Sequence, residues 1–149
     1  MMLTVFNGDH LERDLEDLQN FADTANDVDL LNAFLDDVSE REDVLWKLLR
    51  EKHEQQVPHF NCSLVRFFHN EGYNVYRIRP LTKRRLNKYR ILYAYNAPAN
   101  EIHFLAVVVK RSAPPHINLP SDKFYDYEAN HPISIRIRSE YDNSSWGRI

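Results

Sequence analysis

The sequence predicts an α+β fold in which an N-terminal strand and helices pack on one face of a twisted, mainly antiparallel sheet of four to five strands. The first observation is that residues 9–57 repeat apolar side chains at helical spacing. The second is that residues 63–110 arrange apolar side chains as β-strands do, before a helical stripe returns near the C-terminus. The length of 149 residues suits one domain, residues 1–149, with a C-terminal helix.

Residues 1–57 predict one strand and three helices. Leu3–Phe6 is short and β-prone, and it ends at an Asn-Gly turn signal. The third helix is expected to begin at Ser39–Glu42, which has the spacing of a capping box, and to end before Pro58. The apolar groups of the three helices are Leu11, Leu15, Leu18 and Ala22; Val28, Leu31, Leu35 and Val38; and Val44, Leu45, Leu48 and Leu49.

Residues 58–149 predict a four-stranded meander and a last helix. The run Ile102–Val109 is almost wholly apolar, as is typical of a strand at the centre of a sheet. Residues 80–88 form a basic loop, and Asn130-His131-Pro132 resembles a helix start. Ile133, Ile137 and Tyr141 give that helix its apolar stripe. The four strands are expected at residues 63–68, 73–79, 89–96 and 101–110.

Composition and missing motifs exclude several function classes. A single cysteine, Cys62, excludes an intramolecular disulfide and a Cys-based zinc finger. No apolar stretch approaches the roughly 20 residues that span a bilayer, and the N-terminus lacks the features of a signal peptide, so a soluble cytoplasmic protein is expected. The chain has no Gly-rich phosphate loop, G-x-S-x-G, H-E-x-x-H or C-x-x-C, and His103 has no spaced partner. No metal or cofactor is therefore predicted.

The charge is divided unevenly along the chain. Residues 1–57 carry 15 acidic and 5 basic side chains, whereas residues 58–149 carry 7 and 14. Such asymmetry indicates either a surface that binds a polyanion or two oppositely charged layers that attract each other within the fold. The two interpretations stay open at this point.

Cations on adjacent predicted strands are the strongest candidates for chemistry. Arg77 and Arg79 lie two residues apart and leave the same face of one strand, while Arg90 opens the next strand and Arg111 closes the one after. Guanidinium groups bind phosphate through paired hydrogen bonds, and tyrosines can stack on bases or carry protons. An ordinary solvated sheet face is the alternative. The basic loop adds Lys83, Arg84, Arg85 and Lys88, and the nearby aromatic groups are Tyr73, Tyr89, Tyr125 and Tyr127.

Three strand motifs resemble the core of the RelE/ParE superfamily of bacterial type II toxins. The family pattern has a strand Y-[KR]-[IL]-[KR], a strand Y-R-[IL]-x-Y and an apolar strand that ends in two cations. The matching segments here are Val75–Leu81, Tyr89–Tyr95 and Ile102–Arg111. The match is close over about residues 72–111, and the order of strand, helices and meander fits the remainder loosely.

The resemblance implies a RelE-like mRNA interferase, an endoribonuclease that acts on mRNA at the ribosome without a metal and is neutralised by a cognate antitoxin protein. The 2′-hydroxyl attacks the adjacent phosphodiester and leaves a 2′,3′-cyclic phosphate. This reaction needs a proton acceptor, a proton donor to the 5′-oxygen and cations for the charge of the phosphorane.

The resemblance also assigns roles to individual residues. Arg77 and Arg79 match two basic residues that position RNA and take part in proton transfer. Arg90 matches an arginine that stabilises the transition state, and Arg111 matches the cation that closes the last strand. The C-terminal tyrosine that stacks on the substrate base corresponds to Tyr127 or Tyr125.

The chain departs from the family at the proton acceptor. RelE has lysines where this chain has Arg77 and Arg79, and arginine is a poor base because it is effectively always protonated. His116, His131 or Tyr127 would then have to accept the proton. The helical segment is also longer and more acidic than usual, so it could cover the basic sheet and compete with RNA, or it could form a dimer contact.

Two other functions compete with the RNA-cleaving toxin. A ParE-like toxin would keep the fold, would not cleave RNA, and would act on DNA gyrase. A non-catalytic binding or adaptor protein would use its acidic helices to hold a partner and its arginines as surface groups. The joint presence of four arginines on three adjacent strands favours the ribonuclease, and the missing proton acceptor argues against it.

Overall fold

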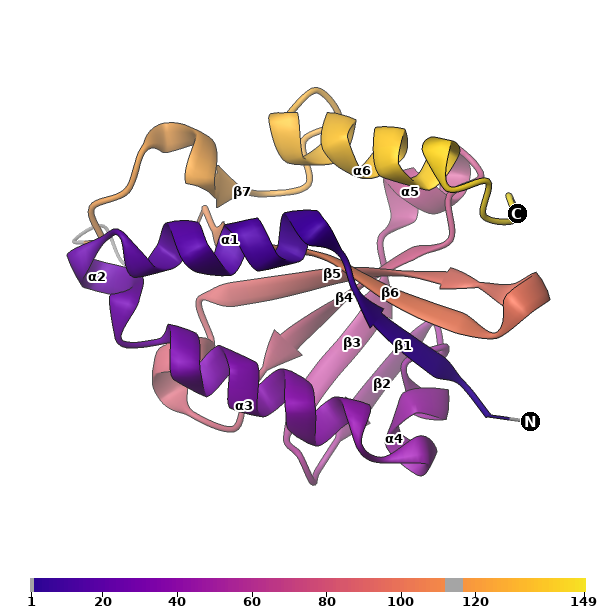
Figure 1. The fold of residues 1–149 in the computed structure, drawn as a ribbon, viewed down its shortest axis with the longest axis horizontal. Helices are drawn as coiled ribbons and strands as arrows, with labels where there is room; N and C mark the ends of the chain where they lie inside the picture. Colours follow the sequence, from indigo (N-terminus) through magenta and orange to yellow (C-terminus); the bar gives the residue numbers. More distant parts are fainter. Residues whose placement is uncertain (1, 112–116) are drawn as a thin grey trace.

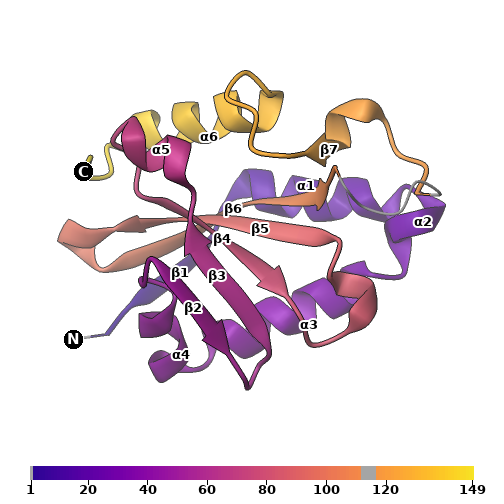
Figure 2. The same cartoon turned by 180° about the vertical axis from the view of Figure 1, so that it is seen from behind.

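A computed structural model describes residues 2–111 and 117–149. The described chain forms a seven-stranded sheet with helices on both of its faces (Figures 1 and 2). Its hydrogen-bonded order is β1-β6-β5-β4-β3-β2, and β7 also pairs with β6. The strands are β1 (Thr4–Asn7), β2 (Lys52–Gln55), β3 (Phe60–Leu64), β4 (Val75–Pro80), β5 (Tyr89–Asn96), β6 (Glu101–Lys110) and β7 (Phe124–Tyr125).

The predicted α+β class, the mainly antiparallel sheet and the C-terminal helix are confirmed, but the sheet is larger than four to five strands. Strands β2, β3, β4, β5 and β6 pair with one another in antiparallel fashion, while β1 and β7 run parallel to β6 along its other edge. The expected meander is present as β3 to β6. The additional strands are β2, which forms a hairpin with β3, and the two-residue β7.

The helices lie in two layers, which corrects the expectation that they cover one face only. Helices α1, α3 and α4 bury their apolar sides against one face, and α5 and α6 pack on the other (Figures 1 and 2). No helix within the described ranges is long and apolar enough to cross a bilayer. The helices are α1 (Asp9–Gln19), α2 (Ala22–Ala25), α3 (Val28–Ser39), α4 (Glu42–Lys47), α5 (Arg66–Asn70) and α6 (Pro132–Asn143), with short 3-10 turns at Arg84–Leu86, Ala97–Ala99 and Ser121–Lys123.

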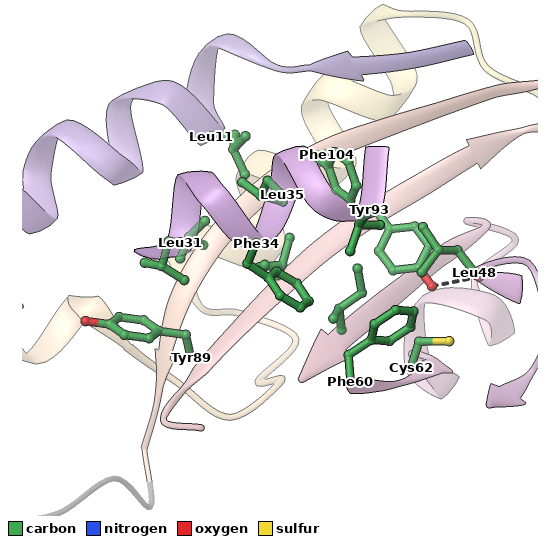
Figure 3. Close-up of a cluster of buried hydrophobic side chains, with 14 of the residues drawn as sticks. Leu11, Leu31, Phe34, Leu35, Leu48, Phe60, Cys62, Tyr89, Tyr93 and Phe104 are labelled. Carbon is green, nitrogen blue, oxygen red and sulfur yellow. Dashed lines mark hydrogen bonds between the residues drawn. The ribbon is translucent and has the colours of Figure 1, made fainter. Parts of the chain in front are cut away.

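The larger core fills the space between the sheet and the N-terminal helices. Leu11 of α1 and Phe34 of α3 meet Tyr93 and Phe104 of the central strands (Figure 3). The Tyr93 hydroxyl is fully buried and donates to the Leu48 carbonyl oxygen at 2.7 Å. Burial of this polar group is tolerated because it is hydrogen-bonded. Cys62 lies in the same core, where burial raises the pKa of its thiol.

The second core lies beneath α6. Ile137 and Tyr141 are completely buried, as their spacing predicts. The expected start of this helix is also confirmed, because His131 is the N-cap residue and Pro132 is the first helical residue. The His131 imidazole accepts from the Ile133 N–H at 3.0 Å. This cap fixes the point where the chain enters α6.

Two local predictions are wrong. The capping box at residues 39–42 does not form, because Ser39 ends α3 and the N-cap of α4 is Arg41, which makes no side-chain cap. Glu42 instead accepts from the Leu3 N–H at 3.0 Å and so attaches β1 to α4. The strand expected at 63–68 ends at Leu64, and the aromatic residues that follow turn into α5.

An ion pair closes a gap in the edge of the sheet. Strand β1 pairs with β6 only as far as Phe104, and β7 pairs with it only from Val109. Within this gap, Asp14 of α1 accepts from the Val107 N–H at 3.0 Å and from both terminal nitrogens of Arg136 at 2.8–2.9 Å. Arg136 of α6 also donates to the Leu105 carbonyl oxygen at 3.1 Å. The pair therefore links α1, β6 and α6.

Replacing Asp14 with alanine should lower the free energy of unfolding by about 3–5 kcal/mol, because the change leaves Arg136 and the Val107 N–H without their partner. Asp17 on the same helix pairs with Lys123 at 2.8 Å, but both side chains are substantially exposed. Asp17→Ala should therefore cost only about 0–1 kcal/mol. Urea unfolding of the two variants measures the difference, and equal losses would contradict the role given to Asp14.

Stability should fall in mild acid. Burial lowers the pKa values of His69 and His103, although Glu101 beside His103 opposes the shift at that site. The unfolded chain then binds protons more readily than the folded one, so the free energy of unfolding decreases as the pH falls through about 6.5. Glu140 acts in the opposite sense, because burial raises its pKa. Urea unfolding across this range should show a smaller decrease for His103→Gln than for the wild type; equal decreases would count against His103.

Candidate functional site

Strand β4 separates an apolar face from a cationic face. Tyr76 and Ile78 point into the larger core, and Ile78 is completely buried. Arg77 and Arg79 therefore leave the opposite face, where their side chains are half-buried. Figure 2 shows this side of β2 to β5 without a helix across it, with α5 and α6 along its upper border. The alternation expected from the sequence is confirmed.

The register between β4 and β5 brings Arg90 to the same place. Arg77 lies opposite Leu92, and Ile78 lies opposite Ile91. One further step of this register sets Arg79 opposite Arg90, and side chains at such positions are about 5 Å apart at their Cβ atoms. Three of the four predicted strand arginines thus share one patch, here called the arginine face: Arg77, Arg79 and Arg90.

These three guanidinium groups have no carboxylate within 4 Å among the described residues. Arg77 donates to the Asn61 side-chain oxygen, and Arg90 donates to the carbonyl oxygens of Asn87 and Tyr89 at 2.7 and 2.9 Å. The Nε atom of Arg79 is buried without a hydrogen-bond partner in the described chain. Neutral contacts therefore orient Arg77 and Arg90, while none of the three charges is compensated by a carboxylate of the described residues.

The close approach of these charges is visible in the electrostatics of Arg90. Burial lowers the pKa of Arg90, and repulsion from Arg79 and Arg77 lowers it further. The nearby Tyr127 opposes these effects. An anion between the three groups would relieve the repulsion, and phosphate oxygens match the paired donors of a guanidinium.

Tyr127 reaches the arginine face from the segment between β7 and α6. Its backbone has φ +61°, a left-handed conformation that is unfavourable by about 1 kcal/mol for a residue with a bulky side chain. Its hydroxyl is buried and has no hydrogen-bond partner among the described residues. Burial raises the pKa of Tyr127, although Arg77 and Arg90 oppose the rise, so the hydroxyl keeps its proton at neutral pH. Strained residues of this kind concentrate at functional sites.

Arg77 stands between two hollows in this surface. The first hollow extends toward the sheet edge formed by β2, and the second extends toward α5 and Tyr127. Both therefore open beside the same guanidinium. The first is lined by Lys52, His53, Glu54, Asn61, Cys62 and Arg77, and the second by Ser63, Leu64, Val65, Arg66, Phe67, Arg77 and Tyr127.

Glu54 is a site residue that sequence reasoning missed. It lies opposite Asn61 on β3, and Asn61 in turn lies opposite Arg79 on β4, so all three side chains leave one face of the sheet. At about 4.8 Å per strand, Glu54 is roughly 10 Å from Arg79 along the sheet. Its carboxylate lies 3.7 Å from the exposed imidazole of His59. Residues 52–55 give no strand signal, so only the observed pairing places Glu54 here.

The fourth predicted arginine lies elsewhere. Arg111 donates from Nε to Glu128 at 2.8 Å, and neighbouring Lys110 forms an ion pair with Asp126. The Lys110 ammonium also lies 4.8 Å from the centre of the Tyr127 ring. Both cations that close β6 thus hold the 126–128 segment, and through it they position Tyr127.

The four cations of the predicted RNA-binding loop have two different environments: two pair with a buried carboxylate and two are exposed. Arg85 and Lys88 contact the carboxylate of Asp27 at 2.5 and 2.8 Å, and Tyr89 donates to it at 2.6 Å. Burial alone would raise the pKa of Asp27, but hydrogen bonds from Lys88, Tyr89 and Arg85 outweigh it and lower the pKa. The two cations thus attach the loop to the start of α3, while Lys83 and Arg84 are exposed.

The remaining predicted groups differ in their access to the arginine face. Tyr125 is 1% exposed and shares a 2.6 Å hydrogen bond with Ser134, whereas Tyr127 reaches the face. Both ring nitrogens of His131 are occupied, by the Ile133 N–H and the Phe124 carbonyl oxygen. His116 lies outside the described residues. Of the two tyrosines proposed for base stacking, the geometry favours Tyr127.

The acidic helices lie across the sheet from the arginine face. They bury Tyr76 and Ile78, the residues that alternate with the two arginines of β4. In this arrangement they cannot cover the arginines, so the idea that the acidic segment folds over the basic sheet is not realised. Among residues 2–111 and 117–149, no three His, Cys, Asp or Glu side chains are grouped to hold a metal ion.

The chemistry of the site has to be derived from its own residues. It combines three uncompensated cations, a protonated phenol and a carboxylate on an open sheet face. No protein-family model matches the chain, and no match was found among curated proteins or among solved structures.

Proposed function

We propose that this protein is a RelE-like toxin that cleaves mRNA at the ribosome and is neutralised by an antitoxin protein. The observation that carries the proposal is the arginine face: three half-buried guanidinium groups, free of carboxylates, beside the strained Tyr127. Charges without counterions in such proximity suit a phosphodiester, whose transition state gains negative charge. An open face also admits a polymer, which an enclosed cavity would not.

In the proposed reaction the 2′-oxygen forms a bond to phosphorus while the bond from phosphorus to the 5′-oxygen breaks. Arg77, Arg79 and Arg90 hold the non-bridging oxygens and stabilise the charge of the phosphorane. The products are a 2′,3′-cyclic phosphate and a free 5′-hydroxyl. Since each arginine stays protonated throughout, none of the three has to exchange a proton.

Two other groups carry the protons in this scheme. Glu54 accepts the proton of the 2′-hydroxyl, because its carboxylate lines the hollow beside Arg77 and faces the same side of the sheet. Tyr127 donates a proton to the departing 5′-oxygen, because its protonated hydroxyl lies near Arg77 and Arg90 and has no hydrogen-bond partner among the described residues. Glu54 thereby replaces the histidine candidates as the proton acceptor.

A binding protein without catalytic activity is the second candidate. The observation in its favour is that Glu54 is exposed and lies 3.7 Å from His59 at the rim, not buried against the arginines. The arginine face would then hold the RNA backbone without promoting cleavage, and the affinity would fall steeply with salt.

Expression of the wild type beside Arg90→Ala in bacteria tests the proposal. The wild type should arrest growth and create discrete new 5′ ends in abundant mRNAs, as measured by primer extension. Arg90→Ala should reduce cleavage about 100-fold or more, since it removes one cation from the transition state. Arg13→Ala is the matched control, because Arg13 is exposed on α1, across the sheet.

Each other outcome selects a different function. Growth arrest with intact mRNA would refute cleavage and favour a gyrase-directed toxin. A folded protein that neither arrests growth nor cuts RNA would indicate the binding or adaptor protein. Equal cleavage by wild type and Arg90→Ala would show that the arginine face is not the active site.

Glu54→Gln separates catalysis from binding. This change should slow single-turnover cleavage about 10²–10⁴-fold, the usual contribution of a general base, while RNA affinity is retained. Glu51→Gln is the matched control, because Glu51 precedes β2 and lies outside the hollow beside Arg77. Unchanged cleavage by Glu54→Gln would assign proton transfer to another group.

A further inference from the structure

The hollow between α5 and Tyr127 has the features of a pocket for a flat aromatic ring. Its volume is about 290 Å³, and the aromatic residues Phe67 and Tyr127 are among those that line it. The Phe67 ring is held in place by Phe68, at 4.1 Å between ring centres, and by the guanidinium of Arg138 at 5.8 Å. Phe67 is nevertheless only half-buried, so part of this fixed ring remains accessible.

The position of this hollow ties it to the phosphate site. Arg77 lines the hollow and is also one of the three cations of the arginine face. Ser63 lies directly opposite Arg77 in the sheet and adds a hydroxyl, and Arg66 adds donors from the first residue of α5. A nucleotide has the same arrangement, an anionic group joined to a flat base with polar edges.

We propose that this hollow, here called the α5 pocket, holds one nucleobase of the RNA whose phosphate lies on Arg77, with Phe67 as a stacking surface. This inference rests on the proposed function, because it assumes RNA on the arginine face. It assigns a role to α5, which lies outside the segment that resembles known toxins. Stacking on an aromatic ring strengthens binding of a base while tolerating different bases.

Abasic scanning of a bound RNA tests the α5 pocket. The probe is a short fluorescein-labelled 2′-O-methyl RNA, which cannot undergo 2′-oxygen attack, and the readout is fluorescence anisotropy. One abasic position should weaken binding to the wild type by about 5- to 150-fold, the range expected for loss of one stacked base. Phe67→Ala should weaken binding of the intact RNA by a similar factor but should not further weaken binding of that abasic RNA.

Three variants make the result specific. Arg77→Ala should weaken binding of intact and abasic RNA alike, because it removes a phosphate contact. Phe67→Leu should reproduce the loss seen with Phe67→Ala while keeping apolar packing against Phe68. Phe6→Ala is the matched control, since Phe6 is 41% exposed on β1 and should leave binding unchanged.

Different results would overturn the α5 pocket and the proposed function. If the wild type binds RNA but no abasic position matters, or if Phe67→Ala weakens intact and abasic RNA equally, the α5 pocket is overturned and RNA binding stands. If RNA is bound through Phe67 but mRNA is not cut in cells, cleavage fails while the pocket stands. If the folded protein binds no RNA, both are overturned.

Discussion

The contact between Asp14 and Arg136 is the one on which the remaining architecture depends. On the edge of β6 that faces away from β5, no strand pairs with the residues between Phe104 and Val109, and an exposed strand edge there would leave backbone groups unpaired. The carboxylate and the guanidinium supply the missing partners and at the same time join helices from opposite layers. Helix α6 is thereby fixed against the sheet, and with it the preceding segment, which brings Tyr127 to the arginine face.

The uneven charge of the chain is used in part for contacts within the fold. Asp14, Asp17 and Asp27 of the acidic segment pair with cations of the basic segment, so part of the asymmetry is attraction between layers. The arginines of β4 and the start of β5 take no part in this pairing. The chain has 22 acidic side chains, yet within residues 2–111 and 117–149 none of them pairs with these three adjacent guanidinium groups. An external anion explains this more easily than the fold does.

The sequence predicts strands and the arginine face where the signal is local. Alternation along β4 and the apolar run of β6 locate the central strands, and their pairing brings Arg77, Arg79 and Arg90 together. Residues 52–55 lack alternation, so β2 and Glu54 are found only through pairing with β3. Residues 66–70 contain β-prone phenylalanines, but contacts with α6 favour a helix there. The partners of Arg85 and Arg111 are 58 and 17 residues away, beyond the reach of any local pattern.

The same distribution of charge determines how an RNA would approach. The acidic helices present their exposed carboxylates on one side of the sheet, and the arginine face lies on the other. The protein is therefore a dipole in which one surface repels a polyanion and the opposite surface attracts it. Such a field orients an encounter before any contact is made. Under the proposed function, the acidic segment would not have to cover the site to influence binding, because from the far side of the sheet it would direct an RNA toward the arginines and toward the adjoining α5 pocket.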